Sequence, residues 1–129
     1  MTNINRIETI VDSIAFLHRA YQPDSEAYKL RNPMMLKNYS PPGKHKVDEN
    51  GLRVFDSFLD GYKSGVYDVT IKLKGESNSG IKTSDTLRNL LAVFSINKEE
   101  DINTVVFFLR KAVSKEVTPL TPLSYFKEN

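Results

Sequence analysis

The feature that most restricts the fold of this chain is the helical spacing of its apolar residues. In residues 4–21 they recur every three or four positions, which places one apolar stripe on a helix. Segments 87–94 and 102–113 show the same spacing. The residues of the first stripe are Ile7, Ile10, Val11, Ile14, Leu17 and Tyr21. Since such stripes are buried by packing helices together, the chain is expected to be mainly α-helical.

Local signals set the expected helix ends. Pro23 ends the first helix, and residues 24–31 form a short one that stops before Pro33, because a residue preceding proline avoids helical backbone. Residues 83–85 are expected to cap the next-to-last helix. The last helix is expected to begin at a capping box in which Asn97 is followed by an acidic residue three positions on.

The middle of the chain allows two interpretations. Ser57 with Asp60 forms a capping box, and a glycine follows residue 74, so a helix is predicted over 57–74. Residues 67–74 also alternate apolar and polar side chains, which makes a strand the alternative. Residues 52–55 are expected to be extended and to pair with residues 35–39. A small two-stranded β ribbon would result.

Length and composition favour a single domain over residues 1–129. Four substantial helices, one short helix and the ribbon would form it, and residues 118–129 would pack as an irregular strap. The chain has no cysteine, which excludes disulfides and thiolate metal sites. Its N-terminus lacks a basic and apolar leader, and no apolar run approaches the length of a membrane span. A cytoplasmic protein without membrane attachment is therefore expected.

The most unusual stretch covers residues 27–47, which hold five basic residues and no carboxylate, although the whole chain has a net charge of only +2. The candidate ligand-binding residues there are Lys29, Arg31, Lys37, Tyr39, Lys44, His45 and Lys46. Such a stretch favours a protein or an acidic polymer as partner. Because cations contact phosphates and tyrosines stack on bases, a single-stranded nucleic acid is the alternative. A solvated edge without a specific ligand is the third interpretation.

Three short motifs carry a resemblance to a known family. They are Arg31-Asn32-Pro33-Met34-Met35-Leu36-Lys37, Arg53-Val54-Phe55 and Ser57-Phe58-Leu59-Asp60-Gly61, with a looser match at Thr86-Leu87-Arg88-Asn89-Leu90-Leu91. This order resembles phage-associated proteins with a lysozyme-like helical scaffold, whose motif reads R-N-x-P-G-N-I/L-R. The chain departs from it where Met34-Met35 replaces Gly-Asn. The resemblance implies a lysozyme-like fold that cleaves or binds peptidoglycan, or serves as a structural component.

The enzyme alternative depends on Glu26. Lysozyme-like enzymes place their catalytic acid on a helix that leads into the β element, and Glu26 lies on the corresponding short helix. A glycosidase needs a second carboxylate, for which Asp48 and Glu49 are the nearest choices. A carboxylate in the first turn of a helix is also favoured by the helix dipole alone, which requires no catalytic role.

Other signals favour ordinary structural explanations. The loop over 75–83 misses the phosphate-binding pattern because Ile81 displaces the lysine. Asp56 and Asp60 alternate with basic residues, as on a solvated helix face. We therefore expect no metal and no cofactor. The sequence predicts a small binding or assembly module without catalytic chemistry of its own, with a glycosidase using Glu26 and a nucleic-acid binder using segment 29–46 as alternatives.

Overall fold

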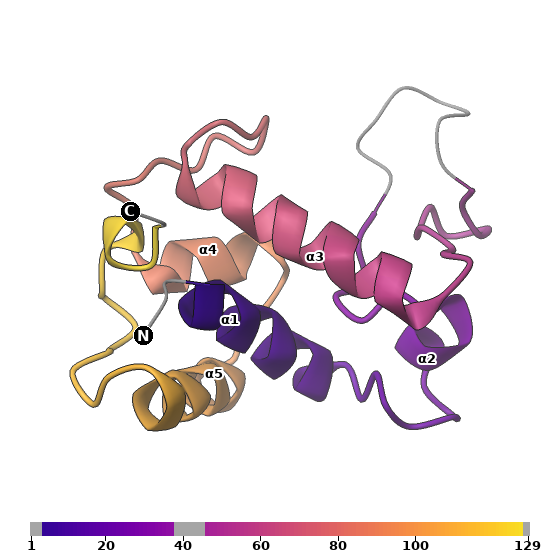
Figure 1. Ribbon diagram of the computed structural model, residues 1–129, viewed down its shortest axis with the longest axis horizontal. Helices are drawn as coiled ribbons and strands as arrows, with labels where there is room; N and C mark the ends of the chain where they lie inside the picture. Colours follow the sequence, from indigo (N-terminus) through magenta and orange to yellow (C-terminus); the bar gives the residue numbers. More distant parts are fainter. Residues whose placement is uncertain (1–3, 38–45, 128–129) are drawn as a thin grey trace. The chain divides into compact units, whose positions relative to one another are not determined.

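A computed structural model describes residues 4–37 and 46–127 and is mainly helical (Figure 1). These residues form the helices α1 (Ile4–Leu17), α2 (Glu26–Leu30), α3 (Phe58–Leu73), α4 (Leu87–Val93) and α5 (Glu99–Ala112), and the short 3-10 helix η1 (Leu123–Tyr125). The predicted helices are confirmed in number and order, and the segment that could also have been a strand is helical.

The structure does not support the predicted β ribbon, because the described residues contain no strand. Lys37 pairs with Leu52, and Val47 pairs with Arg53, each only as an isolated antiparallel bridge. A tight turn limits this pairing. The carboxylate of Asp48 accepts hydrogen bonds from the backbone N–H groups of residues 50 and 52, both at 2.9 Å. The structure therefore gives no support for a β element of lysozyme type, and Tyr39 of the predicted ribbon lies outside the described residues.

The chain divides into two compact units. Unit 1 takes the residues up to Ser13 and those from Val66 onward, and unit 2 takes Ile14–Gly65. Helices α1 and α3 each contribute one part to each unit. The prediction of one domain over 1–129 stays a prediction.

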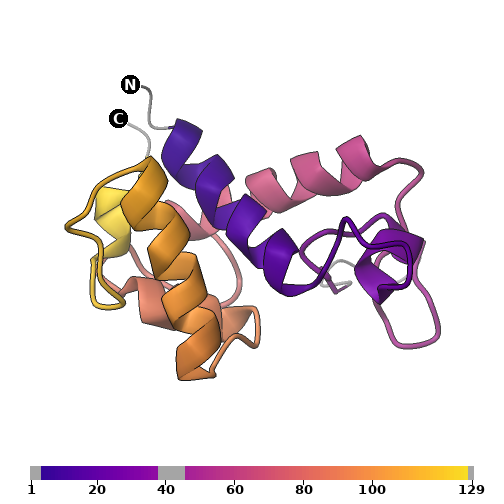
Figure 2. The same cartoon turned by 90° about the horizontal axis from the view of Figure 1, so that it is seen from below.

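Unit 1 contains α4, α5, η1 and the adjoining parts of α1 and α3. Helix α5 runs beside the N-terminal half of α1 in both ribbon views (Figure 2). The fully buried large residues of this unit are Ile10, Leu73, Leu87, Leu90, Leu91, Ile102, Leu109, Leu123 and Phe126. Most of these residues lie on the apolar stripes that the sequence predicts.

The C-terminal segment packs along the start of α4. Leu123 donates its backbone N–H to the carbonyl oxygen of Asp85 at 2.8 Å, and Leu87 donates to the carbonyl oxygen of Thr121 at 2.9 Å. Leu123 and Phe126 are fully buried, whereas Leu120 is 69% exposed. Leu123 and Phe126 therefore belong to the core, whereas Leu120 does not. The strap over 118–129 as a whole stays a prediction.

Backbone turns of left-handed conformation end several helices. Gly75, with φ 73°, follows α3 as predicted, and the next backbone N–H donates to the carbonyl oxygen of Ile71. After α1 the left-handed residue is Arg19, with φ 55°. The next residue, Ala20, donates its backbone N–H to the carbonyl oxygen of Ala15 at 3.0 Å. This turn ends α1 four residues earlier than predicted. Tyr21, assigned to the buried stripe, is consequently 56% exposed.

The caps agree only in part with expectation. Ser57 caps α3 by accepting the backbone N–H of residue 60 at 3.1 Å, as predicted. Thr86 rather than residues 83–85 caps α4, since Asp85 instead accepts the N–H of residue 82. Helix α5 begins after Lys98 without a side-chain cap, so the predicted cap at Asn97 is wrong. Three acidic residues in its first turn offset the positive end of the helix dipole.

We expect Leu109→Ala to lower the free energy of unfolding by about 2 to 5 kcal/mol, because it opens a cavity at a fully buried position. Leu120→Ala makes the same chemical change at an exposed position and should alter stability by less than about 0.5 kcal/mol. Urea unfolding followed by circular dichroism compares the two variants. Equal effects would contradict the assignment of Leu109 to the core.

Candidate functional site

Helix α2 carries the first part of the basic segment, by which we mean residues 29–46. Ser25 caps this helix by accepting the backbone N–H of Tyr28 at 3.1 Å. Ala27 and Leu30 are buried, whereas Tyr28 and Lys29 are exposed. This alternation orients the lysine and the tyrosine toward solvent.

The side chain of Asn32 fixes the loop that follows α2. Asn32 is fully buried, and its amide nitrogen donates to the carbonyl oxygens of Leu36 and Arg53, both at 3.0 Å. Its amide oxygen accepts the backbone N–H of Leu36 at 2.8 Å. Three of the four hydrogen bonds available to an amide side chain are therefore made. They join two chain segments that lie 21 residues apart.

Residues 52–55 act as a backbone spine for the basic segment. Arg53 donates to the carbonyl oxygen of Leu36 at 3.0 Å, and Val54 donates to that of Lys46 at 2.8 Å. Phe55 donates to the carbonyl oxygen of Leu30 at 3.0 Å. The backbone segments that carry Arg31, Lys37 and Lys46 are thus brought together, although up to 15 positions separate these residues in the sequence.

Helix α3 packs against the loop after α2 at Gly61. A Cβ atom at Gly61 would lie 2.0 Å from the carbonyl oxygen of Arg31 and 2.9 Å from Cδ of Pro33. Only glycine fits this contact, because the first of these atoms belongs to the backbone and cannot rotate away. The sequence motifs around residues 31, 53 and 61 therefore meet at one place in unit 2.

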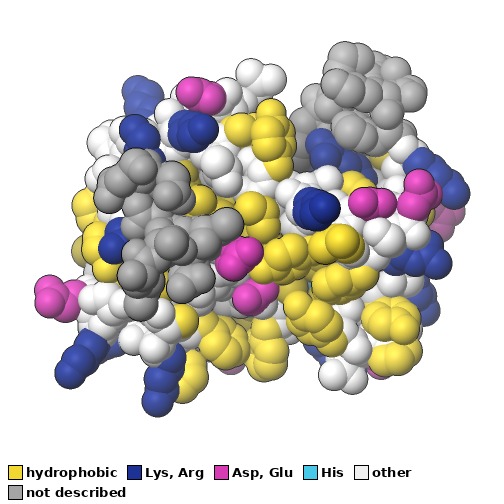
Figure 3. Space-filling model, viewed as in Figure 1, with side chains coloured by type: hydrophobic (Ala, Val, Ile, Leu, Met, Phe, Trp, Pro, Cys, Tyr) yellow, Lys and Arg dark blue, Asp and Glu magenta, His cyan; other side chains and the backbone are white. Residues whose placement is uncertain are grey.

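The described Lys and Arg side chains of the basic segment are exposed, and little nearby negative charge compensates their positive charge. Lys29, Lys37 and Lys46 form no ion pair with a carboxylate of residues 4–37 or 46–127. The guanidinium of Arg31 donates to the carbonyl oxygen of Phe55 at 3.4 Å, and it forms no ion pair with a carboxylate of the described residues. Figure 3 shows Lys and Arg side chains, with Asp and Glu side chains among them, along the edge of unit 2 on which α2 and the following segments lie. The remaining predicted ligand residues, Tyr39, Lys44 and His45, lie outside the described residues.

Arg53 lies beside these cations, although it is not among the ligand residues predicted from the sequence. It is half-buried, and its Nε atom has no hydrogen-bond partner among the described residues. Its place at the centre of the spine follows from the pairing of residues 36 and 53, which no local sequence signal reveals.

Glu26 lies in a different environment from a catalytic acid. It is the first residue of α2 and is exposed to solvent, so it lacks the apolar surroundings that keep such an acid protonated. Asp48, one nominated partner, uses its carboxylate to close its own turn. Glu49 is exposed in that turn. Among the described residues there is also no group of three or more side chains able to hold a metal ion.

An exposed apolar patch in unit 2 was not expected. Phe16 and Leu59 are each 57% exposed, and the rings of Tyr21 and Phe58 lie 5.2 Å apart. Hydrophobic side chains gather over the end of α1 and the start of α3 in Figure 3. Leu59 is therefore a surface residue of α3 and not a core residue. Because Gly61 faces the loop, a residue two positions earlier lies on the opposite side of the helix.

Comparison of the chain with protein families, curated proteins and solved structures finds no match. Among the described residues, no helix has both the length and the apolar character required to span a bilayer.

Gly61→Ala tests the contact between α3 and the loop. We expect a loss of about 1 to 3 kcal/mol in unfolding free energy, because the methyl group overlaps the backbone. In a helix without this contact the same change would instead stabilise by about 1 kcal/mol. Ser64→Ala, on the same helix, is the control and should change stability by less than about 0.5 kcal/mol. Stabilisation of the Gly61 variant in urea would contradict the contact.

Proposed function

We propose that this chain is a small binding or assembly module that uses its basic segment to contact an acidic partner, and that it has no catalytic chemistry of its own. The supporting observation is a set of exposed cations that pair with no carboxylate of the described residues and are attached to the spine of residues 52–55. An acidic polymer or an acidic protein surface would supply the missing negative charge.

The rigidity of the support favours binding over a merely soluble edge. Asn32 and Gly61 fix the backbone that carries Arg31 and Lys37, so these cations lose less conformational freedom when a partner binds. A solvated edge requires no such framework. The preorganised backbone therefore supports a role in recognition.

The motifs that resemble phage-associated lysozyme-like proteins support a structural role. Its motif residues Asn32, Arg53 and Gly61 build the framework of the basic segment by hydrogen bonds and close packing. This arrangement favours an architectural use of the motifs. The solvent exposure of Glu26 makes a glycosidase the weaker alternative.

Replacement of Lys29, Lys37 and Lys46 by Gln tests the proposal. Titration of the wild-type chain and of this variant against heparin, single-stranded RNA and single-stranded DNA, at several salt concentrations, measures affinity and its salt dependence. We expect weaker binding by the variant. The slope of log K against log salt should flatten by roughly two to three, because fewer counterions are released.

A second triple variant provides the control. Lys74, Lys82 and Lys115 are exposed lysines of unit 1, and their replacement by Gln removes the same net charge. Their loss should leave most of the affinity intact. Equal weakening by both variants would show attraction to net charge alone, and an absence of binding at low salt would rule out these polyanions as ligands. Preference for either nucleic acid over heparin would favour the nucleic-acid alternative.

A further inference from the structure

Helix α5 carries an exposed aromatic ring between two opposite charges, and the proposed function does not use them. The residues are spaced by four, three and four positions and therefore lie on one stripe of the helix. This stripe, which we call the outer face of α5, consists of Glu100, Thr104, Phe107 and Lys111. Phe107 is 56% exposed, and both charged residues are exposed. The buried residues of α5, such as Leu109, lie on the opposite side of the helix.

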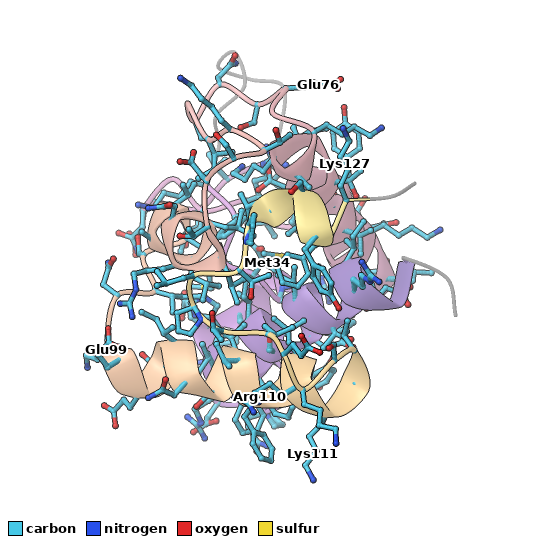
Figure 4. All side chains as sticks on the ribbon, turned by 90° about the vertical axis from the view of Figure 1, so that its left-hand side faces the viewer. Met34, Glu76, Glu99, Arg110, Lys111 and Lys127 are labelled. Carbon is cyan, nitrogen blue, oxygen red and sulfur yellow. The ribbon has the colours of Figure 1, made fainter. Side chains whose placement is uncertain are left out.

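The charges of the outer face have no partner of opposite sign in the same molecule. Glu100 and Lys111 form no ion pair with residues 4–37 or 46–127. The Lys111 ammonium lies 5.7 Å from the ring centre of Phe107, and Figure 4 shows the lysine side chain pointing away from the ribbon of α5. The helix dipole favours an acid at the start of a helix and a base at its end, but it does not account for an aromatic ring exposed between them.

A hollow beside the outer face extends the surface that a second helix could contact. Its volume is about 430 Å³, and residues of α1 and α5 line it, among them Ser13, Phe108, Lys111 and Ala112. Lys111 belongs to both the lining and the outer face, so the two features adjoin. The Phe107 and Phe108 rings also lie edge to face, with their centres 6.0 Å apart. All of these residues belong to unit 1.

We propose that the outer face of α5 binds the same face of a second copy of this chain, with the two helices antiparallel. Around a two-fold axis between residues 105 and 106, position 100 of one copy faces position 111 of the other. Glu100 would thus lie opposite Lys111 twice, and Phe107 would pack on Thr104 of the second copy. The Thr104 hydroxyl donates to the carbonyl oxygen of Glu100 in its own helix at 3.0 Å, so it needs no partner across the interface.

The charge pattern favours a second copy as the occupant. Reversal of the helix turns the order acid, ring, base into base, ring, acid, so α5 itself supplies the complementary charges. A parallel pair would place like charges opposite each other. The net charge of the chain is only +2, which leaves little repulsion between copies. Because one helix pair buries less than the roughly 1,600 Å² of a standard interface, we expect a dissociation constant on the order of 0.1 mM.

Sedimentation equilibrium of the full chain, from about 10 µM to about 1 mM, tests for this dimer. We expect Phe107→Ala to raise the dissociation constant at least about tenfold, because it removes the apolar contact nearest the axis. Tyr67→Ala is the matched control, since Tyr67 is an exposed aromatic residue of the same unit, and it should leave the constant unchanged. A monomer over the whole range, or equal weakening by both variants, would overturn the proposal.

Charge reversal tests the antiparallel pairing. Glu100→Lys or Lys111→Glu alone places like charges opposite each other and should weaken dimerisation at least about tenfold, whereas the double variant restores both pairs and should regain most of the affinity. A double variant that keeps its helical circular dichroism but dimerises no better than the single ones would overturn the proposal. Dilution of the wild-type chain needs no substitution and should shift the amide resonances of residues 100–111. Dilution shifts confined to other segments would also overturn it. None of these outcomes depends on the basic segment of unit 2.

Discussion

The arrangement of the basic segment depends on the hydrogen bonds made by the buried side-chain amide of Asn32. Its nitrogen and oxygen together join the loop after α2 to the spine of residues 52–55. Loss of this side chain would leave the backbone N–H of Leu36 and the carbonyl oxygen of Arg53 with fewer partners in a buried place, at a cost of about 1 to 3 kcal/mol for each unsatisfied group. The Asn32 amide thus adds to the backbone hydrogen bonds that join these extended segments.

The helices could be predicted because their signals are local. Apolar spacing identifies α1, α4 and α5, and the side chain of Ser57 and the glycine at position 75 set the ends of α3. The predictions are wrong where tertiary contacts or backbone conformation, and not local signals, determine the structure. The left-handed turn at Arg19 carries no glycine to mark it, and the face of α3 that is buried is decided by the contact of Gly61 with a distant loop.

The basic segment and the outer face of α5 differ in how far the sequence reveals them. The excess of cations in the basic segment is a matter of composition and can be read directly from the chain. The lack of carboxylate partners within the described residues, and the inclusion of Arg53, follow only from the fold. The charges of the outer face of α5 follow helical spacing, but the hollow beside it joins Ser13 of α1 to Phe108 of α5, which lie far apart in the sequence, and no local pattern predicts that these residues share a wall.

Amide hydrogen exchange of the full chain tests the role of Asn32 most directly. The Leu36 N–H donates to a fully buried side-chain oxygen rather than to a backbone carbonyl, so its protection depends on that amide. We expect the Leu36, Arg53 and Phe55 amides to exchange slowly together in the wild-type chain. In Asn32→Ala all three should lose protection, while amides in α5 keep theirs. Exchange of the wild-type Leu36 amide at the rate of an unstructured peptide would contradict the account.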